Sequence, residues 1–226
     1  MPPAPPVPAS GLPAPALAGA RGASRPTLLD ALWTPAGWRA GALRAALAVA
    51  GGSLLLVASA KVRVPLGEVP MTLQTLAVLA LGASLGARLG VAAVLAYLAQ
   101  GLAGLPVFTN TPPLPAGPAY FLGPTAGFML GFLPAAWLAG WAAERGLDRS
   151  ALRLAPVLVA AIALVMGLGL LHLAFFAKLA SGATGLGLEL AFARGVSPFL
   201  LGEAIKVALV AALLPAAWTL LERRAR

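Results

Sequence analysis

The chain has 226 residues, of which 60% are hydrophobic and 10% charged, with a net charge of +9 and no cysteine. Soluble domains carry about 25% charged residues, so this composition excludes an ordinary soluble protein and favours a membrane protein. The lack of cysteine excludes disulfides, thiolate metal sites and cysteine nucleophiles. The arginines flank apolar segments and do not cluster with aromatic residues, so we expect no nucleic-acid partner.

The first 38 residues are rich in proline and alanine and begin MPPAPPVPAS. They have no apolar period, which predicts a disordered cytoplasmic tail at 1–38 ahead of a membrane domain at 39–226. No compact apolar core with a cleavage site precedes Arg21 and Arg25, so we do not expect a signal peptide.

The rest of the chain is a series of apolar segments that approach the roughly 20 residues needed to cross a bilayer. It predicts an all-α integral membrane protein with six transmembrane helices. Glycine recurs every fourth residue near two of these segments, a spacing that lets helices approach closely. The expected spans cover residues 42–60, 71–85, 89–105, 123–142, 154–176 and 198–221.

The basic residues predict the orientation of these helices. Eleven of the sixteen fall on one side, four on the other, and Lys206 lies inside the sixth span. Basic residues are retained on the cytoplasmic side, so we expect both termini in the cytoplasm. The loops at 61–70, 106–122 and 179–197 are then expected to face outward.

Two ionisable residues in the sixth span are candidates for ligand binding. Glu203 and Lys206 are three positions apart and therefore share a helical face. A charge at mid-bilayer costs about 2.5–3.5 kcal/mol on insertion scales, so such groups usually face a cavity or each other. Lys206 is expected to bind an anionic group, with Glu203 orienting the lysine or accepting a ligand hydrogen bond. The alternative is a mutual structural pair, or a lysine that extends toward the interface.

Two neutral amides lie close to the expected outer loops. Gln74 is one turn into the second span, and Asn110 lies in a loop with no charged residue from 106 to 122. Amides both donate and accept hydrogen bonds, which suits a ligand with an amide-like edge. The alternatives are a turn position for Asn110 and an interhelical hydrogen bond for Gln74.

Catalytic motifs are weak in this chain. Residues 82–86 read Gly-Ala-Ser-Leu-Gly and match a nucleophile elbow in form, and His172 is the one histidine. The elbow requires a strand-to-helix turn, whereas Ser84 is expected near the cytoplasmic end of an apolar helix. The glycines of SGATGLGLEL lack the ending of a phosphate loop. We therefore expect no enzyme, no cofactor, no metal and no use of ATP by this chain itself.

Four stretches together resemble one family. They are VPLGEVPMTLQTLAVLALGASLGARLG, YLAQGLAGLPVF, GPTAGF and SPFLLGEAIK, in that order between residues 61 and 206. The chain resembles the BioY family, the biotin-binding S components of energy-coupling factor (ECF) transporters. The resemblance implies the six-helix ECF S-component fold in the bacterial inner membrane. It also implies high-affinity capture of biotin from outside, and uptake through a complex with a transmembrane coupling subunit and two ATPase subunits.

The resemblance also implies site residues. Asn110 matches the asparagine that follows the family's Pro-Val-Phe motif, Lys206 matches its lysine, and Glu203 stands where the family usually has aspartate. Gln74 matches the glutamine of the Pro-x-Thr-x-Gln pattern, and Tyr97 lies in the matching third helix.

Biotin offers a ureido ring, apolar parts and a carboxylate. The ureido ring suits Asn110 with Gln74 or Glu203, and the apolar parts suit the walls of the helices. The carboxylate suits Lys206. The alternative is an S component for another anionic vitamin. A stripe on the first span resembles the family's docking motif for the coupling subunit, and packing within the monomer is its alternative. The stripe consists of Ala42, Ala46 and Ala50.

Overall fold

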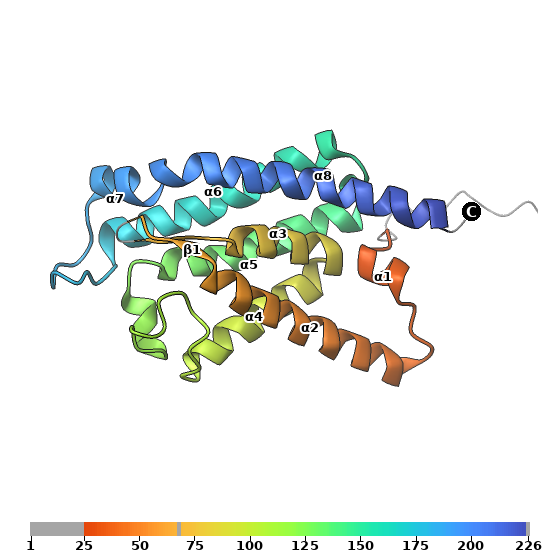
Figure 1. The fold of residues 1–226 in the computed structure, drawn as a ribbon, viewed down its shortest axis with the longest axis horizontal. Coiled ribbons are helices and arrows are strands. Elements are labelled where there is room, and N and C mark those ends of the chain that lie inside the picture. The colour runs from red at the N-terminus through yellow and green to blue at the C-terminus, as the bar shows by residue number, and fades with distance from the viewer. Residues whose placement is uncertain (1–24, 67–68, 225–226) are drawn as a thin grey trace, which may run out of the picture.

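The computed structural model describes residues 25–66 and 69–224 as a bundle of helices (Figure 1). Six long helices agree in number with the six expected spans. They are α2 (Trp38–Lys61), α3 (Gln74–Leu85), α4 (Ala87–Leu102), α5 (Ala126–Glu144), α6 (Ala151–Phe175) and α8 (Leu200–Arg224).

The six helices differ in length. Within the described residues, the helices long and apolar enough to cross a membrane are α2, α5, α6 and the segment Leu188–Arg224 that contains α8. At 1.5 Å per residue, α3 and α4 reach only about 18 and 24 Å, short of a hydrocarbon core of about 30 Å. The second and third expected spans are therefore shorter than full crossings.

Small elements that the all-α expectation did not include join the helices. Strands β1 (Arg63–Val64) and β2 (Met71–Thr72) pair antiparallel, so the helix expected from residue 71 begins at Gln74 instead. Helix α7 (Leu188–Gly195) and short 3-10 turns make up the other connections. These turns are η1 (Pro118–Leu122), η2 (Leu147–Arg149) and η3 (Ser197–Phe199).

The folded part of the chain begins earlier than the expected boundary at residue 39. Helix α1 (Leu28–Leu32) has a capping box in which Thr27 and Asp30 bond each other's backbone and side chain. Arg44 of α2 donates a 2.8 Å hydrogen bond to Asp30, which ties α1 to the first long helix. The predicted tail is thus ordered from residue 25 onward, and residues 1–24 lie outside the described part of the chain.

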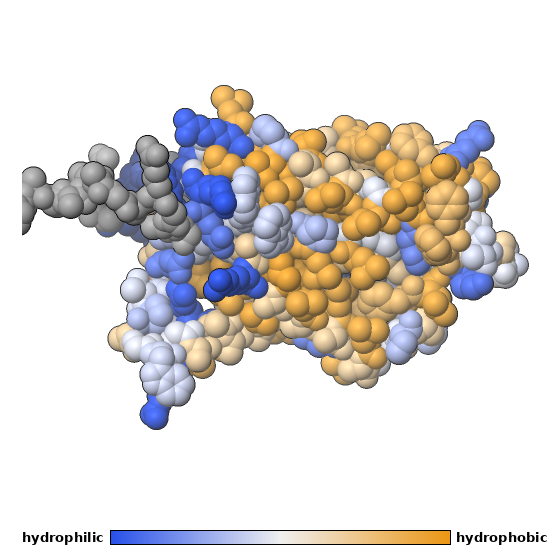
Figure 2. Space-filling model, turned by 180° about the vertical axis from the view of Figure 1, so that it is seen from behind, coloured by the Kyte–Doolittle hydropathy of each residue, from blue (hydrophilic) through white to orange (hydrophobic). Residues whose placement is uncertain are grey.

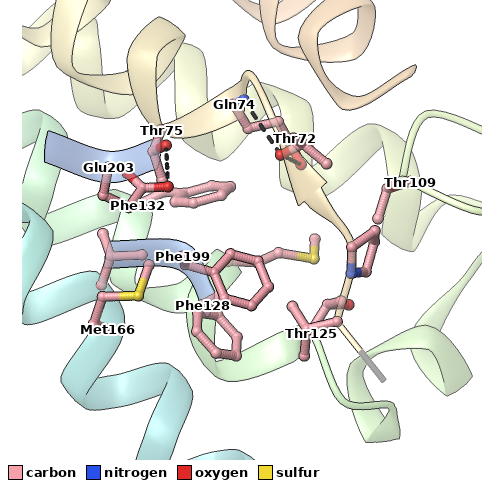
Figure 3. A pocket seen from close by; sticks show the side chains of 14 residues that line it. Thr72, Gln74, Thr75, Thr109, Thr125, Phe128, Phe132, Met166, Phe199 and Glu203 are labelled. Atoms are coloured by element: carbon pink, nitrogen blue, oxygen red, sulfur yellow. Dashed lines mark hydrogen bonds between the residues drawn. The ribbon is translucent and has the colours of Figure 1, made fainter. Parts of the chain in front are cut away.

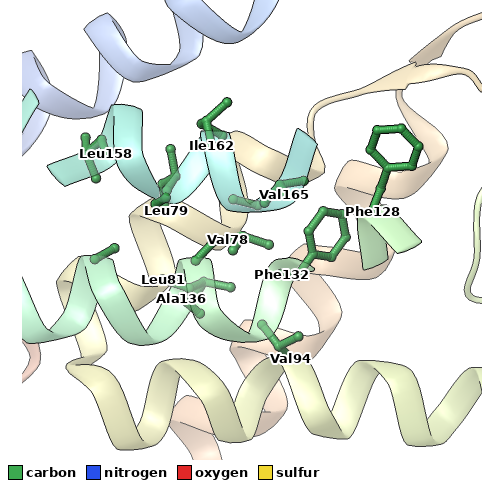
Figure 4. Close-up of a cluster of buried hydrophobic side chains, with 14 of the residues drawn as sticks. Val78, Leu79, Leu81, Val94, Phe128, Phe132, Ala136, Leu158, Ile162 and Val165 are labelled. Atoms are coloured by element: carbon green, nitrogen blue, oxygen red, sulfur yellow. The ribbon is translucent and has the colours of Figure 1, made fainter. Parts of the chain in front are cut away.

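Helix α5 lies at the centre of the core and packs against α3, α4 and α6. Glycine makes these contacts close: a Cβ on Gly82 would lie 2.4 Å from the carbonyl oxygen of Ala136, and one on Gly131 would lie 2.7 Å from the Cα of Val165. Figure 4 shows Val78, Phe132 and Val165 interleaved between these helices. The four-residue glycine spacing therefore serves close helix packing, as expected.

The surface has an apolar middle and two polar ends (Figure 2). We name the end with residues 61–66, 69–73, 103–125 and 176–199 the loop end, and the end with α1, residues 145–150 and Arg224 the terminal end. An apolar band between polar ends is the pattern of a bilayer-embedded protein.

Candidate ligand-binding site

A buried ion pair links α8 to the start of α3. Glu203 and Lys206 are 4% and 5% exposed, and Lys206 Nζ lies 2.7 Å from Glu203 Oε1. The ammonium also donates to the Thr72 carbonyl oxygen at 2.6 Å and to Thr75 Oγ1 at 2.9 Å. An ammonium has three N–H donors, so all three are engaged. The expectation that Lys206 binds a ligand anion is therefore not supported by this arrangement.

The two carboxylate oxygens of Glu203 differ in their hydrogen-bond partners. Oε1 accepts hydrogen bonds from Thr75 Oγ1, at 3.0 Å, and from Lys206. Oε2 is buried without a hydrogen-bond partner among the described residues. Buried polar atoms are rarely left unpaired, and a buried charged acceptor without a donor is costly. Oε2 can therefore accept a hydrogen bond from a ligand.

Glu203 lines a cavity between α3, α5, α6 and α8, which we call the inner cavity (Figure 3). Its apolar walls include Phe128, Phe132, Met166 and Phe199, and its polar lining includes threonines. Its volume is about 40 Å³, whereas cavities that hold small molecules measure about 300–1,000 Å³. A ligand of vitamin size therefore requires these flexible methionine and phenylalanine side chains to move. The threonines are Thr72, Thr75, Thr109 and Thr125.

Gln74 lines the inner cavity and is braced by Tyr97. Gln74 Nε2 donates to the Tyr97 hydroxyl at 2.8 Å, and the Thr72 hydroxyl donates to Gln74 Oε1 at 3.3 Å. Tyr97 is fully buried and packs edge-on against Phe108, with ring centroids 5.4 Å apart. Tyr97 is absent from the inner cavity's described lining. Its place is therefore behind Gln74, as a support.

Asn110 is not brought to the inner cavity. It lines a second cavity of about 380 Å³ at the loop end, which we call the outer cavity, together with Tyr120 and Lys178. Its φ of 59° is a left-handed turn conformation, which asparagine tolerates better than most residues. Thr125 lines both cavities. Asn110 and Glu203 therefore line different cavities, which share Thr125 as a lining residue.

A lysine fixes the loop that carries Thr109 and Asn110. Lys61, the last residue of α2, donates to the carbonyl oxygens of Pro106, Phe108 and Thr111 at 2.7, 2.8 and 2.7 Å. These contacts join positions 45 to 50 residues apart, so local sequence pattern gave no signal of them. Tyr120 donates to the Thr109 carbonyl oxygen at 2.7 Å, and burial raises the pKa of its hydroxyl. The loop is therefore held from both sides.

The threonines are the site residues that the sequence interpretation missed. Thr72 and Thr75 belong to the MTLQTL stretch that supplied Gln74, and the polar spacing in that stretch was the available signal. Thr109 directly precedes Asn110 and is 4% exposed.

Ser84 and His172 lie far apart. Ser84 is near the end of α3, two residues before Gly86. Gly86 lies beside the end of α5, because a Cβ on Gly86 would be 2.9 Å from the Glu144 carboxylate. His172 Nε2 lies 3.0 Å from the Gly123 carbonyl oxygen, just before α5 begins. The 19 residues of α5 span about 28 Å. The two side chains therefore form no catalytic pair.

The small-residue stripe on α2 is open to the surroundings. Ala42, Ala46 and Ala50 are all exposed, and no heavy atom of the described residues lies within 4 Å of a Cβ placed on the neighbouring Gly51. The alternative of packing within the monomer is therefore not what these three side chains do.

Comparison with known proteins decides the family. The model of the BioY family matches residues 31–223. The chain belongs to the BioY family. It is 36% identical over 165 residues to a protein named biotin transporter BioY2 from Lactococcus lactis, covering 72% of this chain and 83% of that protein. It is 34% identical over 157 residues to the biotin transporter BioY of Thermotoga maritima, covering 70% and 85%.

A solved structure shares the BioY-family fold. The S component for biotin from an ECF-type ABC transporter superposes with a TM-score of 0.68 at 22% identity, over 81% of this chain and 95% of that chain. The ECF S-component fold expected from sequence is thereby confirmed. Together with the four membrane-length apolar helical segments, it makes the chain a multi-pass membrane protein.

Proposed function

We propose that the chain captures biotin and serves as the substrate-binding S component of an ECF-type transporter in the bacterial inner membrane. Membership of the BioY family supports the class, since the relatives named above are biotin transporters. The observation that carries the proposal is Glu203 Oε2, a buried acceptor beside the inner cavity to which none of the described residues donates a hydrogen bond. No catalytic step belongs to this function.

The chemistry of biotin matches this acceptor. The ureido ring of biotin carries two N–H donors and one carbonyl acceptor. Glu203 Oε2 accepts one of these N–H groups in a charge-assisted hydrogen bond, the stronger kind. Lys206 and Thr75 hold Oε1 and so leave Oε2 directed to the ligand. Lys206 thus contributes by positioning Glu203.

The apolar walls account for the rest of the ring system. The thioether ring of biotin packs against the phenylalanine and methionine side chains of the inner cavity, where Met166 and Phe199 supply adaptable contact. Gln74, fixed by Tyr97, offers its amide toward the ureido edge. Asn110 contributes from the outer cavity to the part of the ligand nearest the loop end.

Uptake requires partners, because no nucleotide-binding motif is present in the sequence. In the proposed complex, a transmembrane coupling subunit docks on the exposed Ala42, Ala46 and Ala50 stripe of α2, and two ATPase subunits supply the energy. The excess of basic residues at the terminal end supports a cytoplasmic position for this end and an outward position for the loop end. Lipid surrounds the apolar band.

A vitamin panel tests the proposed ligand. Purified protein in detergent is heated with biotin, riboflavin, thiamine or pantothenate, each at the same concentration. A ligand at 100 times its dissociation constant stabilises the folded state by about 2.7 kcal/mol. We expect biotin alone to raise the unfolding temperature. A shift with a different acidic vitamin and none with biotin would indicate the alternative S component.

A further inference from the structure

The outer cavity contains a cation that the proposed binding mode leaves without a role. Among the described residues that line this cavity, Lys178 alone carries a charge. The volume of about 380 Å³ falls within the range of about 300–1,000 Å³ typical of small-molecule sites. Asn110 and Tyr120 add polar groups to the lining. The cavity is therefore both large enough and polar enough to receive part of a ligand.

Hydrogen bonds to the backbone hold Lys178 in place. Its backbone N–H donates to the Leu122 carbonyl oxygen at 2.7 Å, and it forms a β-bridge with Thr184. Its Nζ donates to Thr184 Oγ1 at 2.6 Å. Since an ammonium has three donors, two remain for another acceptor. Lys178 is thus an exposed cation on a hydrogen-bonded backbone, with free donors at the loop end.

Lys206 differs from Lys178 in this respect. The ammonium of Lys206 is fully engaged by Thr72, Thr75 and Glu203, and the pair that it forms with Glu203 is neutral overall. A carboxylate brought beside this pair would meet Glu203, a like charge, without a free N–H donor to bind it. The inner cavity therefore suits an uncharged polar head and disfavours an anion.

We propose that the outer cavity is an anion subsite in which Lys178 binds the carboxylate of a ligand whose uncharged head lies beside Glu203. Thr125 lines both cavities, so a ligand with a chain between head and carboxylate extends from one to the other past this residue. Asn110 lies in the same subsite and offers an amide donor to the carboxylate. The inference rests on the proposed function, because it takes biotin as the ligand.

The test compares biotin with biotinamide, whose uncharged amide replaces the carboxylate, by equilibrium dialysis against purified full-length protein. Wild type is compared with Lys178→Met, which keeps the chain length and removes the charge. Arg194→Gln is the matched control, because Arg194 is exposed on α7 at the same end and does not line the outer cavity. We expect Lys178→Met to weaken biotin by about fivefold, the upper end of the range for a solvent-accessible ion pair.

The ratio of the two affinities carries the result. We expect biotinamide to bind Lys178→Met within about twofold of wild type, and Arg194→Gln to leave both ligands unchanged. Lys206→Met should weaken both ligands together, since it acts through Glu203. We expect wild type to bind biotin more tightly than biotinamide. The inference is overturned if Lys178→Met keeps this preference for biotin, or if Lys206→Met abolishes it instead. Failure of wild type to bind either compound would reject the proposed function itself.

Discussion

Thr75 donates a 3.0 Å hydrogen bond to Glu203, which joins the first turn of α3 to α8. The same hydroxyl accepts from Lys206 at 2.9 Å, so it bridges both members of the buried ion pair. The hydrogen bonds of Thr75 occupy Glu203 Oε1 and one N–H of Lys206, so these groups are not available to a ligand. Glu203 Oε2 is the atom that this arrangement leaves available.

The first prediction concerns this bridge. Thr75→Val keeps the side-chain shape and removes the hydroxyl, which leaves Glu203 and Lys206 each with one contact fewer. We expect biotin to bind about tenfold more weakly, since hydrogen bonds to charged groups contribute about 1.5–3 kcal/mol. Thr75→Ser restores the hydroxyl and should bind like wild type. Equal affinities for the valine and serine variants, measured by calorimetry, would show that the hydroxyl does not position Glu203.

Asn110 has two separable roles, and two substitutions distinguish them. Glycine adopts the left-handed φ of 59° at no steric penalty, but offers no side chain, whereas alanine lacks the amide and also disfavours this conformation. If the amide contacts the ligand, Asn110→Gly should lose affinity about as much as Asn110→Ala. Full affinity in the glycine variant would assign Asn110 to the turn alone. The unfolding temperature should fall only in the alanine variant.

The stripe on α2 predicts a variant that separates binding from assembly. Ala46→Trp places a bulky ring in the middle of the exposed stripe and changes no residue that lines either cavity. We expect biotin affinity of the isolated chain to stay at the wild-type value, while co-purification with the coupling subunit is lost. Leu55→Trp is the control and should leave assembly unchanged, because Leu55 is exposed on the face of α2 opposite Ala46. Co-purification of the Ala46→Trp variant at the wild-type level would place the docking surface elsewhere.

Asp148 at the terminal end predicts how stability depends on pH. Burial raises its pKa, and the hydrogen bond from Trp218 Nε1 and the charge of Arg149 only partly oppose this. A raised pKa means that the folded state binds the proton more tightly than the unfolded chain, so stability falls as pH rises through the folded pKa. Asp148→Asn, neutral throughout, should flatten this dependence at pH values above the ordinary carboxyl pKa of about 4. Thermal unfolding in detergent measures it, and parallel curves for both proteins would contradict the assignment.

Hydropathy and spacing predicted the helices and part of the site. The six long helices follow from apolar runs, and the contact between Glu203 and Lys206 follows from their separation of three residues on one helix. Hydropathy and spacing did not distinguish a ligand-binding role from a structural role for the candidate site residues. The structural alternatives named for Glu203, Lys206, Gln74 and Asn110 are all present, as an ion pair, an interhelical hydrogen bond and a left-handed turn.

The rest of the site depends on contacts between distant positions. The place of Asn110 is set by Lys61, which binds the carbonyl oxygens of its loop from the end of α2. The hairpin of β1 and β2 is two residues long on each side, too short for an alternating pattern. Helix α1 was missed although its capping box, Thr27 with Asp30, is visible in the sequence.

The most direct test of the account is calorimetric titration of biotin into wild type and Glu203→Gln, with helix content and elution volume confirming that both proteins are folded. Glutamine keeps the length of the side chain and removes the negative charge from the oxygen that faces the inner cavity. We predict one biotin per wild-type chain, and binding at least about tenfold weaker in the variant. Undiminished affinity in Glu203→Gln, or no binding of biotin to wild type, would contradict the central claim.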